Sequence, residues 1–252
     1  MNRRRGKRNT SWEKDSRHYN KSVGRSGHYY HQQIVIPGVL RLLKLNSMSS
    51  LLDVGCGQGV LGRAVDPEVK YVGVDVSKSL ITYAQEMDDS ESHTYVVGDG
   101  ENLRQEELFT HISCVLALQN MQKQDRVISN MSSLLEPNGR MVLVLNHPAF
   151  RIPRQSGWGE HPNKIQYRYI NRYLEPLEIP ITMHPGQEKS GLTWSYHVPI
   201  SYYAQALASA GFVIELIEEW TSDKQSEGKA AKMENRARAE IPLFMALVAV
   251  KR

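Results

Sequence analysis

Residues 51–62, LLDVGCGQGVLG, place two overlapping glycine patterns directly after a short apolar run. From Gly55 the stretch is spelled D-x-G-x-G-x-G, with Asp53 two residues before the first glycine. From Gly57 it is spelled G-x-G-x-x-G and ends at Gly62. A glycine loop after the first strand of a parallel sheet lets the backbone approach a ligand closely and opens a helix that points at it. The stretch therefore decides both the fold and the class of ligand.

The register of the loop favours the first pattern. In a dinucleotide site, G-x-G-x-x-G starts directly after the strand, whereas here it would start two residues late. Asp53 at the strand end would repel a pyrophosphate and suits a ligand with a cationic amine. Asp75 and Asp99 follow in the same way at the ends of the next two apolar runs. An acid after the second strand accepts ribose hydroxyls, so the pattern predicts an adenosine that carries an amino acid.

Apolar runs alternate with amphipathic runs along the rest of the chain. Strands are expected at residues 50–55, 71–76, 94–99, 112–118, 140–146, 212–220 and 242–251. Helices are expected at residues 29–45, 78–87, 126–135 and 202–210. Strands that are apolar throughout and separated by helices predict an α/β fold whose parallel sheet is covered on both faces. Right-handed crossovers make it doubly wound, and the last strand is expected to insert antiparallel beside the fifth.

Local signals place the ends of three helices. Ser77 is expected to cap the helix at 78–87, and Ser201 the helix at 202–210. Gly211 and the run EPNG (136–139) are expected to end the helices that precede them.

Residues 148–200 interrupt the alternation. The segment holds seven of the eleven prolines and many aromatic residues, and parts of it alternate like strands. It follows the fifth strand, so it leaves the sheet at the carboxyl ends of the strands, where open α/β folds bind ligands. Long segments of this kind are usually lids or binding elements. We therefore expect a substrate-covering insertion.

The charge of the chain is concentrated at its N-terminus. Residues 1–25 carry nine Lys/Arg and two acidic residues, although the whole chain has a formal net charge of only +4. We expect a basic, disordered tail over residues 1–20 and a single domain over residues 21–252. The tail leaves open a contact with nucleic acid.

The composition is that of a globular protein. No apolar run approaches the ~18 residues of a membrane span, and no apolar stretch follows the basic start, so no secretory signal is expected. The only two cysteines, Cys56 and Cys114, lie far apart. They offer neither a disulfide framework nor a metal-binding CxxC pair, which favours a cytoplasmic location.

Four motifs resemble those of class I S-adenosylmethionine-dependent methyltransferases. They are LLDVGCGQG (51–59), VGVDVS (72–77), GDGENL (98–103) and LLEPNGRMVLVLNHP (134–148), and the likeness spans roughly residues 30–251. The resemblance implies a Rossmann-like sheet of seven strands with the last antiparallel, and an enzyme that uses S-adenosyl-L-methionine. The start GHYYHQ (27–32) and the HP after the fifth strand also resemble a subgroup of bacterial small-molecule methyltransferases of mostly unassigned substrate.

The resemblance also assigns the residues that contact the cofactor. Asp53 would hold the amino group, Asp75 the ribose hydroxyls and Asp99 the adenine amine; alternatively, Asp99 only caps the next helix. The other implied contacts are the loop residues Gly55, Cys56, Gly57 and Gly59, then Val76 and Gly100 at the adenine, and the stretch from Leu116 to Gln119 at the sulfonium. Cys56 is expected to be a small wall residue rather than a nucleophile.

The acceptor pocket is expected between GHYYHQ and the insertion. His147 is the first candidate for a general base, followed by His31 and His197, with a packed structural histidine as the alternative for each. The expected substrate contacts are Tyr29, Tyr30, Arg151, Trp158 and Tyr196. The aromatic residues favour a planar or apolar small-molecule acceptor. We expect no metal, because the end of the fourth strand carries no acid.

Three other functions stay open from the sequence. A nucleic-acid methyltransferase could use the basic tail, although the N/D-P-P-Y/F run of base-modifying enzymes is missing after the fourth strand. A cofactor-binding partner protein without catalysis would keep the same motifs. An NAD-dependent enzyme would use the second spelling of the loop.

Overall fold

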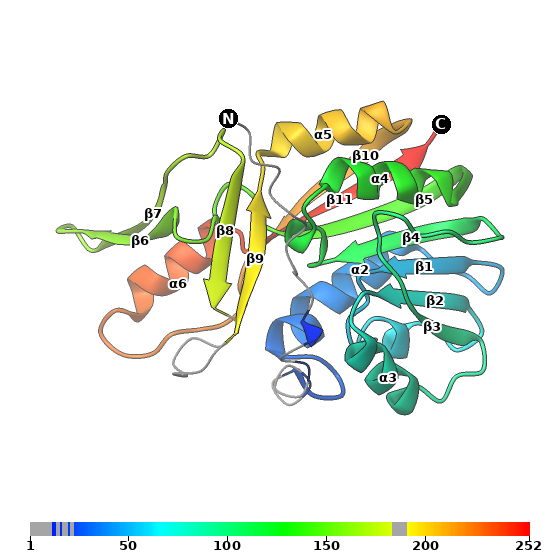
Figure 1. Ribbon diagram of the computed structural model, residues 1–252. Coiled ribbons are helices and arrows are strands. Elements are labelled where there is room, and N and C mark those ends of the chain that lie inside the picture. Colours follow the sequence, from blue (N-terminus) through cyan, green and yellow to red (C-terminus); the bar gives the residue numbers. More distant parts are fainter. Residues whose placement is uncertain (1–11, 14–15, 17–19, 21–22, 183–190) are drawn as a thin grey trace.

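The computed structural model describes residues 12–13, 16, 20, 23–182 and 191–252, and it centres on a seven-stranded sheet (Figure 1). The strand order is β10-β11-β5-β4-β1-β2-β3. The strands are β1 (Ser50–Val54), β2 (Lys70–Asp75), β3 (His93–Val97), β4 (Phe109–Val115), β5 (Leu135–Asn146), β10 (Phe212–Trp220) and β11 (Phe244–Lys251). Strands β1 to β5 pair in parallel, and β11 is antiparallel to both β5 and β10. The predicted doubly wound, mostly parallel sheet is confirmed.

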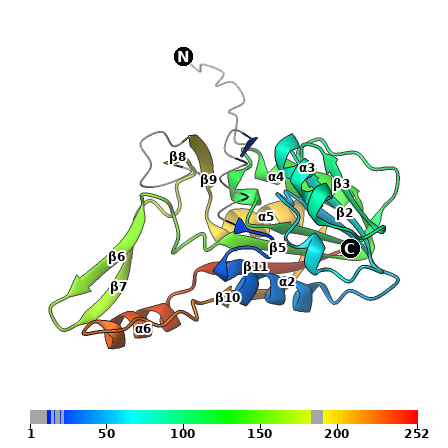
Figure 2. The ribbon, with the colours of Figure 1, turned by 90° about the horizontal axis from the view of Figure 1, so that it is seen from below.

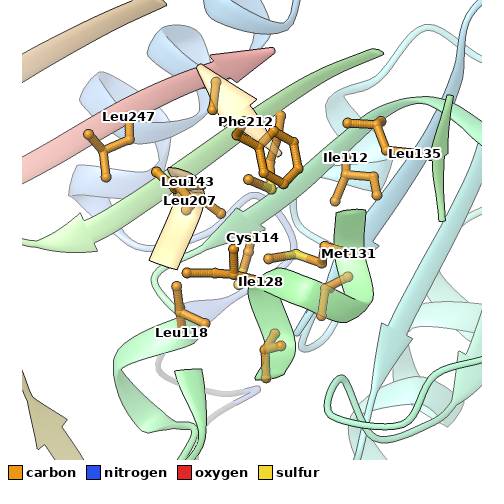
Figure 3. Close-up of a cluster of buried hydrophobic side chains, with 14 of the residues drawn as sticks. Ile112, Cys114, Leu118, Ile128, Met131, Leu135, Leu143, Leu207, Phe212 and Leu247 are labelled. Carbon is orange, nitrogen blue, oxygen red and sulfur yellow. The ribbon is translucent and has the colours of Figure 1, made fainter. Parts of the chain in front are cut away.

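Helices cover both faces of the sheet. Those that pack on the sheet are α2 (Ile36–Leu43), α3 (Lys78–Met87), α4 (Gln124–Ser133) and α5 (Ile200–Ser209), whereas α6 (Ala231–Glu240) contacts β7 (Ile165–Ile170). On one face, α4 and α5 pack their apolar side chains against alternate residues of the central strands, such as Ile112 and Leu143 (Figure 3). On the other face, α2 and α3 pack against Leu51 and Tyr71. Successive side chains of each strand point to opposite faces of the sheet and thus belong to two separate hydrophobic cores.

Two of the expected helix signals are confirmed. The Ser77 hydroxyl accepts from the Leu80 amide at 3.3 Å and caps α3. Gly211 follows the end of α5 with φ at +82°. The expected cap at Ser201 is wrong, because α5 begins one residue earlier, at Ile200, and extended Pro199 occupies the capping position.

The expected helix stop at EPNG is wrong, because α4 already ends at Ser133 with Leu134 as its C-cap, and the run lies inside β5. Strand β5 begins at Leu135 rather than near Arg140, and the pairing register with β4 shifts between Phe109 and His111. Asn138 takes a left-handed φ of +60° within this irregular stretch. The four residues therefore form a bulge inside one long strand.

The segment after the glycine loop also differs from expectation. The expected α-helix is replaced by the three-residue 3-10 helix η3 (Gly62–Ala64). Gly62 lies so close to the rings of Tyr71 and Tyr95 that an added Cβ would clash with both. Asp66 and Pro67 follow at once, and proline cannot continue a helix from within.

Residues 148–200 form two hairpins between β5 and α5. The first pairs β6 (Ser156–His161) with β7 (Ile165–Ile170), and the second pairs β8 (Leu177–Thr182) with β9 (Leu192–His197). In Figure 1 the second hairpin stands beside the edge where β1, β2, β4 and β5 end. Figure 2 shows the first hairpin extending from the sheet alongside α6. Within the described ranges, no helix is both long and apolar enough to cross a membrane.

Candidate cofactor and acceptor site

The glycine loop leaves β1 in a conformation that side chains rarely adopt. Gly55, Gly57 and Gly59 have φ angles of +78°, +56° and +76°. The Gly55 and Cys56 amides donate to the Val74 carbonyl at 2.7 and 3.0 Å, which fastens the loop to β2. A Cβ at Gly55 would clash with the Ala117 side chain after β4. The loop backbone therefore lies directly against the carboxyl end of β4.

Asp75 ends β2 and faces this loop. One carboxylate oxygen accepts from the Gly57 amide at 3.0 Å, and the other accepts from the Ser77 amide at 2.8 Å. Burial raises the pKa of Asp75, while these two amides oppose the rise. Each oxygen can still accept a further hydrogen bond. Beside it, the Val76 side chain is 54% exposed, which is a large apolar surface at a strand end.

Asp99 and Gly100 lie after β3. Asp99 accepts from the Glu101 amide at 3.0 Å within a turn, so it caps that turn rather than a helix. The Gly100 carbonyl accepts from Asn130 of α4 at 3.0 Å. A Cβ at Gly100 would lie 2.9 Å from Val54 at the end of β1. Asp75 and Val76 thus lie at the end of β2 and Asp99 lies after the end of β3, and their contacts with a cofactor stay a prediction.

Asp53 lies deeper than the sequence suggested. Its side chain is 2% exposed, and it accepts from the Ser113 hydroxyl at 2.7 Å and the Tyr71 hydroxyl at 3.0 Å. Burial raises its pKa to about 6, against the effect of these two donors. The contacts favour a role in supporting the loop from below over direct contact with a ligand.

The Cys56 thiol is also poorly suited to chemistry. Burial raises its pKa well above the usual value, with the charge of Asp75 adding to the effect. A thiol of this kind stays protonated at neutral pH and is a weak nucleophile. This agrees with the expectation of a small wall residue.

The end of β4 carries a strained residue and a buried polar atom. Leu116 has φ at +54°, an unusual conformation for a residue other than glycine. Its carbonyl accepts from the Gln119 side chain at 2.8 Å. The Gln119 Oε1 atom is buried and has no hydrogen-bond partner among the residues that the structure describes. A buried acceptor of this kind fits a ligand with hydrogen-bond donors, whereas the strain itself leaves no mark in the sequence.

His147, the first candidate base, is fully engaged by protein groups. Its Nδ1 atom accepts from the Ala149 and Phe150 amides at 3.2 and 3.3 Å. Its Nε2 atom lies 2.6 Å from a Glu219 oxygen, to which it donates when Nδ1 is the acceptor. The ring is 1% exposed. These contacts favour the structural alternative, in which His147 fixes the turn after β5.

His31 and His197 are held less completely. His31 begins the π-helical turn η2 (His31–Val35) and stacks on His28 with ring centres 4.1 Å apart. Its Nδ1 atom is buried without a hydrogen-bond partner in the described ranges, and burial lowers its pKa to about 4. His197 lies 2.8 Å from the Tyr173 carbonyl through Nε2, and burial lowers its pKa. Both rings are therefore neutral near pH 7.

The predicted substrate contacts divide into two groups. Tyr29 donates to Asp223 at 2.9 Å, and the Tyr30 hydroxyl lies 3.1 Å from that of Ser222, so both rings pack on the segment after β10. Arg151 and Trp158 lie in the insertion, where Trp158 is 36% exposed beneath Arg168.

Tyr196 lies apart from both groups. It is buried in β9, and its carbonyl accepts from Gln124 at 3.0 Å. This contact joins the second hairpin to α4.

Glu13 is a residue of the site that no local sequence pattern indicates. Its carboxylate accepts from the Ser77 hydroxyl at 2.6 Å and from the Ser79 amide and hydroxyl at 3.0 and 2.5 Å. Glu13 therefore lies at the N-terminus of α3, and its contact Ser77 is two residues after Asp75 in the sequence. Of residues 1–20, the structure describes Trp12, Glu13, buried Ser16 and Asn20, whereas residues 1–11, 14–15 and 17–19 lie outside the described residues, so the disordered tail stays a prediction. In the part of the chain that the structure describes, no group of three potential ligands could hold a metal ion.

The central part of the chain is similar to known proteins. Residues 52–141 match the model of a family described as a methyltransferase domain. A ubiquinone biosynthesis O-methyltransferase of Coxiella burnetii is 32% identical over 117 residues, which are 45% of this chain and 46% of that protein. The chain thus matches the curated relatives over about half of their length.

Solved structures extend the likeness to most of the chain. An S-adenosylmethionine-dependent methyltransferase from Mesorhizobium loti superposes with a TM-score of 0.69 at 23% identity, covering 90% of this chain and all of that one. A glycopeptide N-methyltransferase solved with S-adenosyl-L-homocysteine superposes with a TM-score of 0.59 at 15% identity, covering 86% and 87%. These likenesses show a shared fold, and S-adenosylmethionine is the cofactor of the methyltransferases that share it.

Proposed function

We propose that this protein transfers a methyl group from S-adenosyl-L-methionine to a small-molecule acceptor, in line with the match of residues 52–141 to a methyltransferase-domain family. The observation that carries the proposal is the contact between the glycine loop and Asp75. The Gly57 amide fixes the carboxylate at the end of β2, and the exposed Val76 side chain lies next to it. The Asp75 carboxylate suits the two hydroxyls of a ribose, and the exposed Val76 side chain suits a flat base.

Each residue at the strand ends would bind a different part of the cofactor. Asp75 would hold the ribose, Val76, Asp99 and Gly100 the adenine, and the glycine loop the methionine part. The buried Gln119 Oε1 offers an acceptor near that part of the loop. When bound, the cofactor supplies an activated methyl group on a cationic sulfur. The protein then has to align the acceptor in line with it and exclude water.

The acceptor would lie between Tyr29 and Tyr30 on one side and the 148–200 insertion on the other. The aromatic residues there support a planar or apolar acceptor, and the Coxiella relative supports an oxygen as the methylated atom. For a general base, the geometry favours His197 over His147. The Tyr173 carbonyl orients the His197 ring through Nε2, which leaves Nδ1 as the basic nitrogen. A cytoplasmic location stays a prediction.

Calorimetry with S-adenosyl-L-homocysteine, S-adenosyl-L-methionine and NAD tests the proposal. We expect micromolar binding of the two adenosyl ligands and none of NAD. Asp75→Ala should weaken binding by about 1–3 kcal/mol, the scale of lost charged hydrogen bonds. The exposed Asp89→Ala variant is the matched control and should bind normally. NAD binding, or equal affinity in the Asp75 variant, would overturn the cofactor assignment.

A further inference from the structure

Arg151 holds an unpaired positive charge beside the expected acceptor pocket. It follows the turn that His147 fixes, and its amide donates to the His147 carbonyl at 2.8 Å. Its side chain is partly buried, yet among the described residues its guanidinium makes no hydrogen bond and no ion pair. Burial lowers its pKa, and Tyr30 is a neighbour close enough to influence it. Its five N–H donors therefore have no acceptor among the residues that the structure describes.

The surroundings of Arg151 add positive charge. Arg168 donates to the Phe150 carbonyl at 2.7 Å and to Ser156 at 3.0 Å, and its guanidinium stacks 5.1 Å above Trp158. Repulsion from Arg151 contributes to lowering the pKa of Arg168. The two arginines thus lie close together with nothing but neutral partners in the described part of the chain.

The nearby cation and acids do not neutralise this pair. Lys224 lies over the rings of Tyr29 and Tyr30, at 4.6 and 4.9 Å. Glu219 is engaged by His147, and Asp223 accepts from Tyr29. The described contacts thus place Lys224 over Tyr29 and Tyr30, and Arg168 over Trp158, with Arg151 close enough to influence both Tyr30 and Arg168.

Resting on the proposed methyl transfer, we infer that the acceptor is a small aromatic carboxylate and that Arg151 binds its acid group. A planar guanidinium with a free fork matches the two oxygens of a carboxylate. Phe150 directly precedes the arginine in sequence, and Tyr30 is its electrostatic neighbour, so the ring of the acceptor would pack on aromatic side chains near the bound carboxylate. The carboxylate is the group by which Arg151 binds the acceptor, and another atom of the acceptor receives the methyl group. A cation that burial has partly stripped of water gains most from such a partner.

The test uses the full chain saturated with S-adenosyl-L-homocysteine and three probes: benzoate, benzamide and phenyl phosphate. We expect benzoate to bind at least about tenfold more tightly than benzamide, since one charged hydrogen-bonded pair is at stake. Arg151→Gln should abolish this preference, and Arg151→Lys should retain part of it. Arg154→Gln, three residues away on the exposed surface, should keep it in full. Affinity for S-adenosyl-L-homocysteine should be the same in all variants, which also reports that they are folded.

Each other outcome has a definite meaning. Equal binding of benzoate and benzamide, no binding of either, or a preference that survives in Arg151→Gln would overturn the inference and leave the proposed function intact. Tighter binding of phenyl phosphate would replace the carboxylate by a phosphate. Failure of the wild-type protein to bind S-adenosyl-L-homocysteine would overturn the proposed function itself.

Discussion

Asp53 supports the glycine loop at a cost in stability of the free protein. It is 2% exposed, and burial raises its pKa from 3.8 to about 6. The folded state therefore binds this proton more tightly than the unfolded chain does. The resulting stabilisation is fully present below pH 3.8 and is lost as the pH rises through about 6. Above that pH the protein carries a buried charge, to which the hydroxyl groups of Tyr71 and Ser113 donate hydrogen bonds.

Asp53→Asn removes this charge and keeps the shape of the side chain. We expect the variant to be more stable than the wild type by about 1–3 kcal/mol near pH 8, with the difference vanishing near pH 4. Urea unfolding of both proteins across this range measures it. A variant that is less stable at every pH would show that the hydrogen bonds of the carboxylate outweigh the cost of burying it.

Gly57 combines a left-handed backbone with a hydrogen bond to Asp75. Gly57→Val forces a β-branched residue to φ near +56°, so we expect loss of S-adenosyl-L-homocysteine binding by calorimetry. Gly228→Val is the matched control. Gly228 also has a positive φ, +87°, but no atom lies within 4 Å of its added Cβ. Both variants should lose stability of the order of 1–2 kcal/mol, and only the first should lose the ligand.

At the scale of elements, the sequence predicted what continuous apolar runs and caps can encode. The strands β1 to β5 and the buried stripe of α4 follow from hydrophobic pattern alone. The pattern could not predict that EPNG stays within β5, because a bulge and a turn use the same residues. Nor could it predict the short η3, which depends on distant Tyr71 and Tyr95 meeting Gly62.

The candidate site divides in the same way. The ends of the apolar runs predict the strand ends, so the positions of Asp75, Val76 and Asp99 at or just after the ends of β2 and β3 could be predicted from the sequence. The partners of His147 and the strain at Leu116 depend on contacts between segments far apart in the chain, and no local signal reports them. The position of Glu13 on α3 is of this second kind.

Glu13 caps α3 from outside the helix. Its carboxylate accepts from the Ser79 amide and lies at the positive end of the helix dipole. Glu13→Ala should therefore speed hydrogen exchange at the start of α3 by up to about tenfold, corresponding to one lost hydrogen bond. Exchange mass spectrometry of peptides covering 77–87 measures the change. Glu86→Ala, an exposed acid near the other end of α3, should leave it unaltered, and equal effects of the two variants would rule out the cap.

At the scale of the whole molecule, one edge of the sheet carries the glycine loop, Asp75 and Val76. The second hairpin of the insertion, β8–β9, stands beside this edge, whereas the first hairpin, β6–β7, extends away from the sheet (Figures 1 and 2). This follows from topology, because loops after parallel strands all emerge on one side. Most of the basic residues of the tail come before Glu13, which contacts α3. Residues 1–11 carry five Lys/Arg and no acid, and they precede Glu13.

A variant that lacks residues 1–11 separates the tail from the site. It should bind S-adenosyl-L-homocysteine as the full chain does, because the contacts of Glu13 and Asp75 remain. Any affinity of the full chain for a random single-stranded RNA should fall steeply with salt. Each phosphate contact contributes about −0.7 to the slope of the logarithm of the binding constant against the logarithm of the salt concentration. Fluorescence anisotropy should show that the shortened chain has lost it. RNA binding that survives both the truncation and about 0.2 M salt would come from the domain itself and would favour a nucleic-acid acceptor over a small molecule.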